Sequence, residues 1–153
     1  MPQVVLGLGS NMGDRAAQLR GAIAHLQPVL QGMRRSRVLE SRAVLPPGAP
    51  SSWNLPYLNM AVIGETPLAP EALLAMVKSA EKQLGRVERD IWAPREIDID
   101  ILAYGTQTIE TPELRVPHAH LLKRDFALLP LSELWPDWVC PLPGKYRGWK
   151  AVD

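Results

Sequence analysis

The sequence predicts an α+β fold of the ferredoxin-like type, in which helices pack on a mostly antiparallel sheet. The predicted elements follow the order strand, helix, strand, strand, helix, strand, which is that of the split βαβ arrangement. A doubly wound parallel sheet would need helices between all of its strands. With 153 residues, 46% of them hydrophobic, the chain can bury one core, so we expect a single domain over residues 1–153.

The first predicted strand and helix open the chain. Gln3 to Leu8 is a short β-branched and apolar run that ends in a glycine-rich turn, which indicates a buried strand. Asp14 is a suitable N-cap for the helix that follows, and Pro28 must end that helix. The expected inner face of the helix has helical spacing and consists of Ala16, Leu19, Ile23 and Leu26.

The middle of the chain contains two further strands and a second helix. A weaker strand candidate covers Arg37 to Val44 and precedes a proline-rich loop from Leu45 to Pro56. Tyr57 to Thr66 alternates in side-chain character, so this strand should have two chemically different faces. The second helix should start at Pro70 and stop at Gly85. Its apolar face consists of Leu73, Val77, Ala80 and Leu84.

The last clear strand is Ile97 to Tyr104, which has strict alternation over its first half. We expect Gly105 to turn the chain toward a short partner strand around Gln107 to Ile109. A further helix is predicted from Asp125 to Leu134.

Charge and composition restrict the class of partner. The chain has 17 basic and 16 acidic residues, so neither nucleic acid nor an anionic membrane is an expected partner, and any phosphate binding must be local. The single cysteine, Cys140, excludes an internal disulfide framework. The chain shows no signal peptide and no apolar run of roughly 18 residues. We expect a soluble, cytoplasmic monomer.

Two aspartates on the last strand are the sharpest chemical signal. Asp98 and Asp100 alternate with three isoleucines, which places both carboxylates on one strand face. Residues i and i+2 lie about 7 Å apart, so two carboxylates can share metal ions held about 4 Å from each other. Hard oxygen ligands favour Mg²⁺. A solvated strand face is the alternative interpretation of this pair.

The segment from Gly85 to Arg95 precedes these aspartates and concentrates cations in a predicted loop. Arg86, Arg89 and Arg95 could bind phosphate oxygens, because a guanidinium group pairs with them bidentately. Taken alone, such arginines are usually solvated. Next to paired aspartates they indicate the anionic half of a nucleotide site.

The glycine-rich turn from Gly7 to Gly13 suggests a dinucleotide-binding fingerprint, but its spacing does not fit. The fingerprint needs a glycine where Met12 stands, and an acid about 20 residues later. A plain strand-to-helix turn is the interpretation that this segment favours by itself.

Further residues fit a flat heterocyclic ligand. Tyr57 and Asn59 share a strand face and offer an aromatic platform with an amide that can both donate and accept. Packing of that tyrosine against a helix is the alternative. His118, Arg124 and Phe126 add a neutral donor, a cation and a second ring.

With these motifs assembled, the chain resembles the 6-hydroxymethyl-7,8-dihydropterin pyrophosphokinases of folate biosynthesis over nearly its whole length. The Trp-x-Pro-Arg-x-x-Asp-x-Asp run is the most specific part. The motifs that support the resemblance are Gly9-Ser10-Asn11, Tyr57-Leu58-Asn59-Met60-Ala61-Val62, Trp92-Ala93-Pro94-Arg95 with Asp98-Ile99-Asp100, and Val116-Pro117-His118 with Arg124 and Phe126.

The resemblance implies a ferredoxin-like fold and transfer of the pyrophosphoryl group of ATP to the pterin hydroxymethyl oxygen, with release of AMP. It implies ATP as co-substrate and two Mg²⁺ ions held by Asp98 and Asp100. The catalytic residues that it implies are Arg86, Arg95, Asp98 and Asp100. The pterin-binding residues are Ser41, Val44, Tyr57, Asn59, Trp92 and Phe126. The ATP-binding residues are Glu81, Arg86, Trp92, Arg95, Ile101, His118 and Arg124.

A second hypothesis from another class is a ferredoxin-like module that binds nucleotide or single-stranded RNA without catalysis. RNA-binding sheets of this shape need paired aromatic residues on central strands and a basic surface. The near-neutral charge and the acids on the last strand argue against it. Release of AMP from ATP that depends on both Mg²⁺ and the reduced pterin would discriminate between the two hypotheses.

Overall fold

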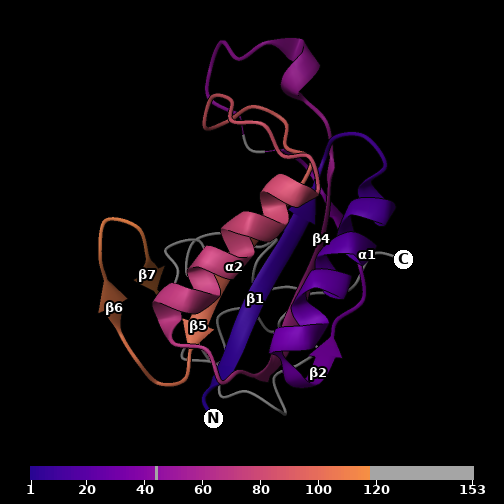
Figure 1. Cartoon of the computed structure of the whole chain (residues 1–153). Coiled ribbons are helices and arrows are strands. Elements are labelled where there is room, and N and C mark those ends of the chain that lie inside the picture. The colour runs from indigo at the N-terminus through magenta and orange to yellow at the C-terminus, as the bar shows by residue number, and fades with distance from the viewer. Residues whose placement is uncertain (44, 118–153) are drawn as a thin grey trace, which may run out of the picture.

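The computed structural model describes residues 1–43 and 45–117 and confirms the α+β architecture (Figure 1). Four of the residues expected in the site, together with the helix predicted after residue 124, lie outside the described residues. Those site residues are Val44, His118, Arg124 and Phe126.

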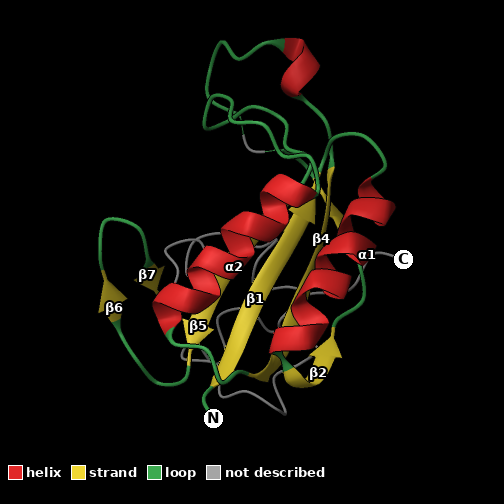
Figure 2. Ribbon diagram, viewed as in Figure 1, coloured by secondary structure: helices red, strands yellow, loops and turns green. Residues whose placement is uncertain are grey.

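The main sheet has five strands, all paired antiparallel. The strand order is β2-β4-β1-β5, and the short β3 also pairs with β4. Helices α1 and α2 both lie on one face of this sheet (Figure 2). The bounds of the strands are β1 Gln3–Ser10, β2 Gln31–Arg35, β3 Leu39–Ser41, β4 Tyr57–Glu65 and β5 Asp98–Tyr104.

Helix α1, Arg15–Leu26, begins where the sequence predicts. The Asp14 side chain accepts a hydrogen bond from the Ala17 backbone N–H at 3.0 Å, which is the expected N-cap. The helix gives way to a 3₁₀ turn, Gln27–Val29, which contains the proline. Ala16 is exposed, so its assignment to the buried face was wrong, because that face begins one turn later. The buried residues of the helix are Leu19, Ala22, Ile23 and Leu26.

Helix α2, Pro70–Gln83, also agrees with the sequence. Gly85 follows its C-cap with φ +96°, the left-handed conformation that lets glycine end a helix. Leu73, Val77 and Ala80 face the sheet and are buried. Within residues 1–43 and 45–117, no helix is long and apolar enough to cross a membrane.

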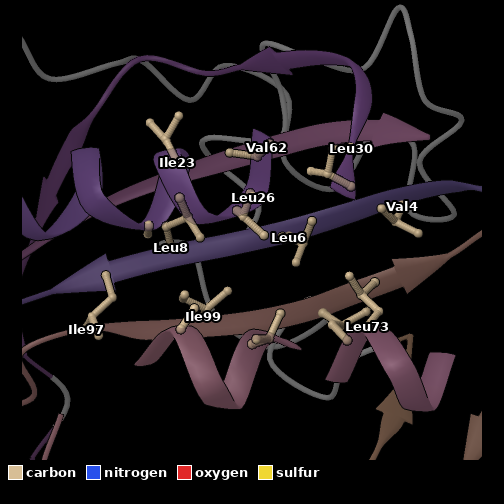
Figure 3. Close-up of a cluster of buried hydrophobic side chains, with 14 of the residues drawn as sticks. Val4, Leu6, Leu8, Ile23, Leu26, Leu30, Val62, Leu73, Ile97 and Ile99 are labelled. Atoms are coloured by element: carbon tan, nitrogen blue, oxygen red, sulfur yellow. The ribbon is translucent and has the colours of Figure 1, made fainter. Parts of the chain in front are cut away.

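The core lies between the helices and the sheet. On β1, Leu6 and Leu8 point toward the helices. Ile99 of the neighbouring β5 and Ile97, directly before that strand, join the same cluster (Figure 3). Met60 and Val62 complete the layer from β4. Because side chains alternate along a strand, the intervening residues lie on the opposite face. The predicted alternation of Ile97 to Ile101 is therefore confirmed.

Two strand predictions differ from the structure. β2 was missed, because four of its five residues are exposed and, among residues 1–43 and 45–117, it pairs with β4 alone, so it has no apolar alternation. The expected pairing of residues 107–109 with β5 was wrong. Instead β6, Ile109–Glu110, pairs with β7, Arg115–Val116, in a separate two-stranded sheet. Only Leu39–Ser41 of the weaker strand candidate is a strand.

Candidate active site

The sheet face away from the helices brings together the residues expected to bind pterin and those expected to bind metal. In the register of the sheet, Gly9 of β1 lies opposite Asn59 of β4 on one side and opposite Asp98 of β5 on the other. Gly7 lies opposite Asp100 in the same way. Directly opposed residues point to the same face, so a single strand separates the amide from the carboxylates.

Gly9 is required here because Asn59 and Tyr57 lie close to it. A Cβ atom placed on Gly9 would lie 2.9 Å from Asn59 Oδ1 and 3.5 Å from Tyr57 Cδ1. The first of these distances is shorter than carbon contacts in real structures allow, so a side chain at this position would displace the amide. The glycine-rich turn therefore leaves room next to the predicted pterin residues.

Asn59 and Ser41 form the polar part of the pterin side. Asn59 is 6% exposed, and its Nδ2 donates to Ser41 Oγ at 2.6 Å, which fixes the orientation of the amide. Tyr57 is half-buried at the start of β4, and Ser41 lies opposite it. Burial raises the pKa of the Tyr57 hydroxyl, and Arg95 partly opposes that rise. Ser41, Tyr57 and Asn59 thus lie together, as expected.

Asp98 sits between two arginines of the preceding loop. Arg86 Nη1 lies 3.1 Å from Asp98 Oδ1, and Arg95 Nη1 lies 3.3 Å from Asp98 Oδ2. All three side chains are between 21% and 24% exposed, so these pairs lie at the surface of the site rather than in the core. Two of the three arginines of the loop, Arg86 and Arg95, thus lie next to Asp98.

A negative charge on Asp100 is unfavourable in the metal-free chain. Burial, with the charges of Asp98 and Glu81, raises the pKa of the Asp100 carboxyl well above its usual range, and the hydrogen bond that the protonated carboxyl donates to Asp98 adds to the rise. A bound cation would relieve this repulsion, so the donor set fits a metal such as Mg²⁺. Within residues 1–43 and 45–117, no group of three or more His, Cys, Asp or Glu side chains is arranged to hold a metal ion by itself. Phosphate oxygens and water would supply the other ligands.

Glu81 anchors one of these arginines from the helix side. It is 3% exposed on α2, and it accepts hydrogen bonds from the Ile99 backbone N–H at 2.9 Å and from Arg86. Lys78 Nζ lies 3.5 Å from its other oxygen. Glu81 therefore holds Arg86 next to Asp98. Ile101 is 3% exposed and its side chain lies in the core, so only its backbone is left to contact a ligand.

The loop that follows α2 lies above the aspartates. Arg89 pairs bidentately with Glu96, at 2.7 and 2.9 Å, so it is bound to a carboxylate and not to the aspartate pair. A cavity of about 260 Å³ lies inside the loop, and Arg86, Arg89 and Arg95 contribute to its lining. Trp92 is 36% exposed at the loop surface, where a substrate could reach it.

Asn11 is a buried residue of the site that was first assigned only to a strand-to-helix turn. It is 4% exposed and bonded to both neighbouring loops. Its local signals were its polar character directly after a buried strand and its place in the Gly9-Ser10-Asn11 motif, and neither indicates which groups it contacts. Its partners lie 44 and 84 residues away in sequence, where no local pattern could indicate them.

Comparison with known proteins agrees with this geometry. The sequence profile of the family described as 7,8-dihydro-6-hydroxymethylpterin-pyrophosphokinase (HPPK) matches residues 5–136. A 2-amino-4-hydroxy-6-hydroxymethyldihydropteridine pyrophosphokinase from Aquifex aeolicus is 44% identical over 142 residues, which cover 93% of this chain and 86% of that protein. One from Methylorubrum extorquens is 41% identical, over 91% of this chain and 86% of that protein.

Longer proteins also match. A folate synthesis bifunctional protein from Chlamydia caviae is 39% identical over 92% of this chain, which spans 32% of that protein. Among solved structures, an HPPK-DHPS protein in complex with substrates aligns with a TM-score of 0.65 and 16% identity. This alignment covers 89% of the present chain and 40% of the other, and it supports the shared fold.

Proposed function

The chain belongs to the 7,8-dihydro-6-hydroxymethylpterin-pyrophosphokinase family, and on that basis we propose that it transfers pyrophosphate from ATP to 6-hydroxymethyl-7,8-dihydropterin in folate biosynthesis. The hydroxymethyl oxygen forms a bond to the β-phosphorus of ATP. The bond from that phosphorus to the oxygen bridging the α- and β-phosphates breaks, and AMP leaves. The products are AMP and the pterin diphosphate.

One arrangement in the structure carries this proposal. The pterin side of the site on β4 and the carboxylates on β5 share one sheet face, and only the glycines of β1 lie between them. Neighbouring strands are about 4.8 Å apart, so the two groups lie about 10 Å from each other. That separation suits a flat ring on one side and a triphosphate on the other.

The aspartate pair would hold the metal. Asp98 and Asp100 offer hard oxygen donors whose negative charges already repel each other. Two Mg²⁺ ions bound there would neutralise phosphate charge and orient the triphosphate. A pair of ions, rather than one, is part of the proposal.

Two arginines would contact the phosphates. Arg86 and Arg95 each lie within 3.3 Å of an Asp98 oxygen, so rotation of their side chains brings them to phosphate oxygens bound next to that carboxylate. A guanidinium group pairs bidentately with such oxygens and spreads the charge that develops during transfer. Glu81 would keep Arg86 in place, and Ile101 would contribute its backbone only.

The pterin would bind against Tyr57, with Asn59 hydrogen-bonding to its edge. Ser41 holds that amide in orientation. Trp92 would cover the bound substrates, because it is exposed in the loop that leads to Asp98. The contributions of Val44, His118, Arg124 and Phe126 are proposed on the sequence resemblance alone.

We also propose that residues 1–153 form a single domain, that the enzyme is a monomer, and that it works in the cytoplasm, where ATP is supplied. Its partners are then the two small-molecule substrates. Gel filtration with light scattering would test the monomer, and a stable dimer would contradict it.

A direct experiment follows AMP formation from ATP by the purified chain. AMP should form only when Mg²⁺ and 6-hydroxymethyl-7,8-dihydropterin are both present, in amounts equal to the pterin diphosphate. The matched control replaces the substrate with a pterin that lacks the hydroxymethyl oxygen, which should bind without forming AMP. Binding of both ligands without any AMP would reject the transferase and favour the non-catalytic binding module.

A further inference from the structure

Asn11 lies at the carboxyl end of the central strand, where two loops meet. One loop precedes β4 and the other precedes β5, and both lie above the end of β1 (Figure 1). Asn11 itself is 4% exposed, so its amide is removed from water and must be satisfied inside the protein.

The amide of Asn11 joins these two loops directly. Its Oδ1 accepts a hydrogen bond from the Arg95 backbone N–H at 2.8 Å, and its own backbone N–H donates to the Arg95 carbonyl oxygen at 3.2 Å. Its Nδ2 donates to the Leu55 carbonyl oxygen at 3.1 Å. One side chain thus holds a residue of each loop at the same time.

The two bonded residues lie next to the two halves of the site. Leu55 is two positions before Tyr57, where the pterin side starts, and Arg95 is three positions before Asp98. We propose that Asn11 is a positioning residue that sets the distance and orientation between the pterin half and the nucleotide half of the site. This inference rests on the proposed pyrophosphoryl transfer.

The chemistry explains why an amide suits this role. A carboxamide presents a donor and an acceptor on one short side chain, whereas a carboxylate only accepts and an alanine does neither. The bonds to Arg95 fix its backbone, and its side chain still reaches Asp98 at 3.3 Å and the Ile91 carbonyl oxygen at 2.7 Å. Asn11 therefore fixes the backbone from which the Arg95 guanidinium extends toward Asp98.

Loss of the Asn11 link should affect the chemical step rather than substrate binding, because each half of the site is built on its own strand. Transfer between two bound substrates requires reacting atoms about 3–3.5 Å apart and aligned, and an error of about 1 Å can lower the rate about 100-fold. Loss of the link between the loops should therefore lower kcat while each substrate still binds.

The test compares Asn11→Asp and Asn11→Ala with Asn54→Asp. The first keeps the acceptor for Arg95 and loses the donor to Leu55, and the second loses both. Asn54→Asp makes the same change of amide to acid at an exposed position of the same loop. We expect kcat to fall about 10-fold to 100-fold for both Asn11 variants, with KM for each substrate within about threefold of the parent. Asn54→Asp should match the parent.

Measurements of ligand binding and of amide hydrogen exchange distinguish a loss of positioning from a loss of substrate binding. Calorimetric affinities for the pterin and for a nonhydrolysable ATP analogue with Mg²⁺ should stay near parent values, while peptides around residues 45–56 and 90–97 exchange faster. An unchanged kcat, or a loss confined to one KM, would overturn the proposal, as would failure of both variants to fold. If the parent chain itself makes no AMP, the proposed function fails. Faster hydrogen exchange in both loops of the Asn11 variants would then still show, independently of activity, that Asn11 joins the two loops.

Discussion

The two faces of the main sheet are built from the same strands, but different physical requirements select the residues on each face. On the helix side, apolar residues such as Leu6 and Ile99 are buried, and what they require is volume and hydrophobicity. On the other side, Gly9, Asn59 and Asp98 are defined by hydrogen bonds, charge and close approach. The helix side therefore determines stability and the opposite side determines chemistry, although their residues alternate along one chain.

The largest effect should come from the aspartate pair. Asp98→Ala removes a proposed metal ligand, and we expect kcat/KM to fall about 10³-fold, which is about 4 kcal/mol. Thermal unfolding should change little, because its removal relieves repulsion with Asp100. Steady-state kinetics and a thermal melt measure both quantities. Glu113→Ala, at an exposed carboxylate, is the control. Retained activity in Asp98→Ala would refute the metal assignment.

The opposite pattern is expected on the helix side. Leu6→Ala empties a fully buried position on β1, and it should lower the free energy of unfolding by about 3 kcal/mol. Because this side chain does not face the site, kcat of the folded protein at low temperature should remain at the parent value. Urea unfolding and kinetics at 10 °C would test it. The control is Val38→Ala, which removes an exposed apolar group. A parallel loss of kcat would mean that the two faces are not separable.

Gly9→Ala should act on the pterin side alone. The added Cβ would meet Asn59 Oδ1 at 2.9 Å and force the amide to move. We expect KM for the pterin to rise about 10-fold to 30-fold, about 1.4–2 kcal/mol, with KM for ATP unchanged. Initial rates with each substrate varied separately would show this. Equal increases in both KM values would indicate a general distortion of β1 instead.

The smallest effect should come from Ser41→Ala. The substitution removes the hydroxyl that accepts from Asn59 Nδ2, so the amide loses its fixed orientation. A hydrogen bond of this kind contributes about 1 kcal/mol, so KM for the pterin should rise about fivefold. The exposed Ser52→Ala serves as the control, and fluorescence titration of the pterin gives an independent measurement. If pterin affinity did not change, the bond would not matter for binding.

The sequence predicted the elements whose residues alternate or repeat over a sufficient length. Helix α2 and strands β4 and β5 were predicted within two residues at each end, because one face of each is apolar. β2 escaped prediction because an edge strand exposed on both faces has no such pattern. The partner of β5 was misplaced because a turn signal at Gly105 marks a change of direction but not the strand that pairs next. β6 pairs instead with β7, which follows it after four residues.

The same distinction applies to the site. Asp98, Asp100, Tyr57 and Asn59 were found because their spacing on a strand assigns them to a face. The contacts of Asn11, and the support of Arg86 by Glu81, depend on elements far apart in the chain. Only the fold brings these groups together, so no local motif could reveal them.

The position of β1 between β4 and β5 has a consequence for how this chain can change over evolution. A deletion of one residue between Val4 and Gly9 would turn every later side chain of the strand over. Leucines would then occupy the substrate face, and glycines would lie beneath the helices. Such a change would empty the core and fill the site in a single event. A point substitution in this segment therefore affects one face of the sheet, whereas a change in its length affects both faces.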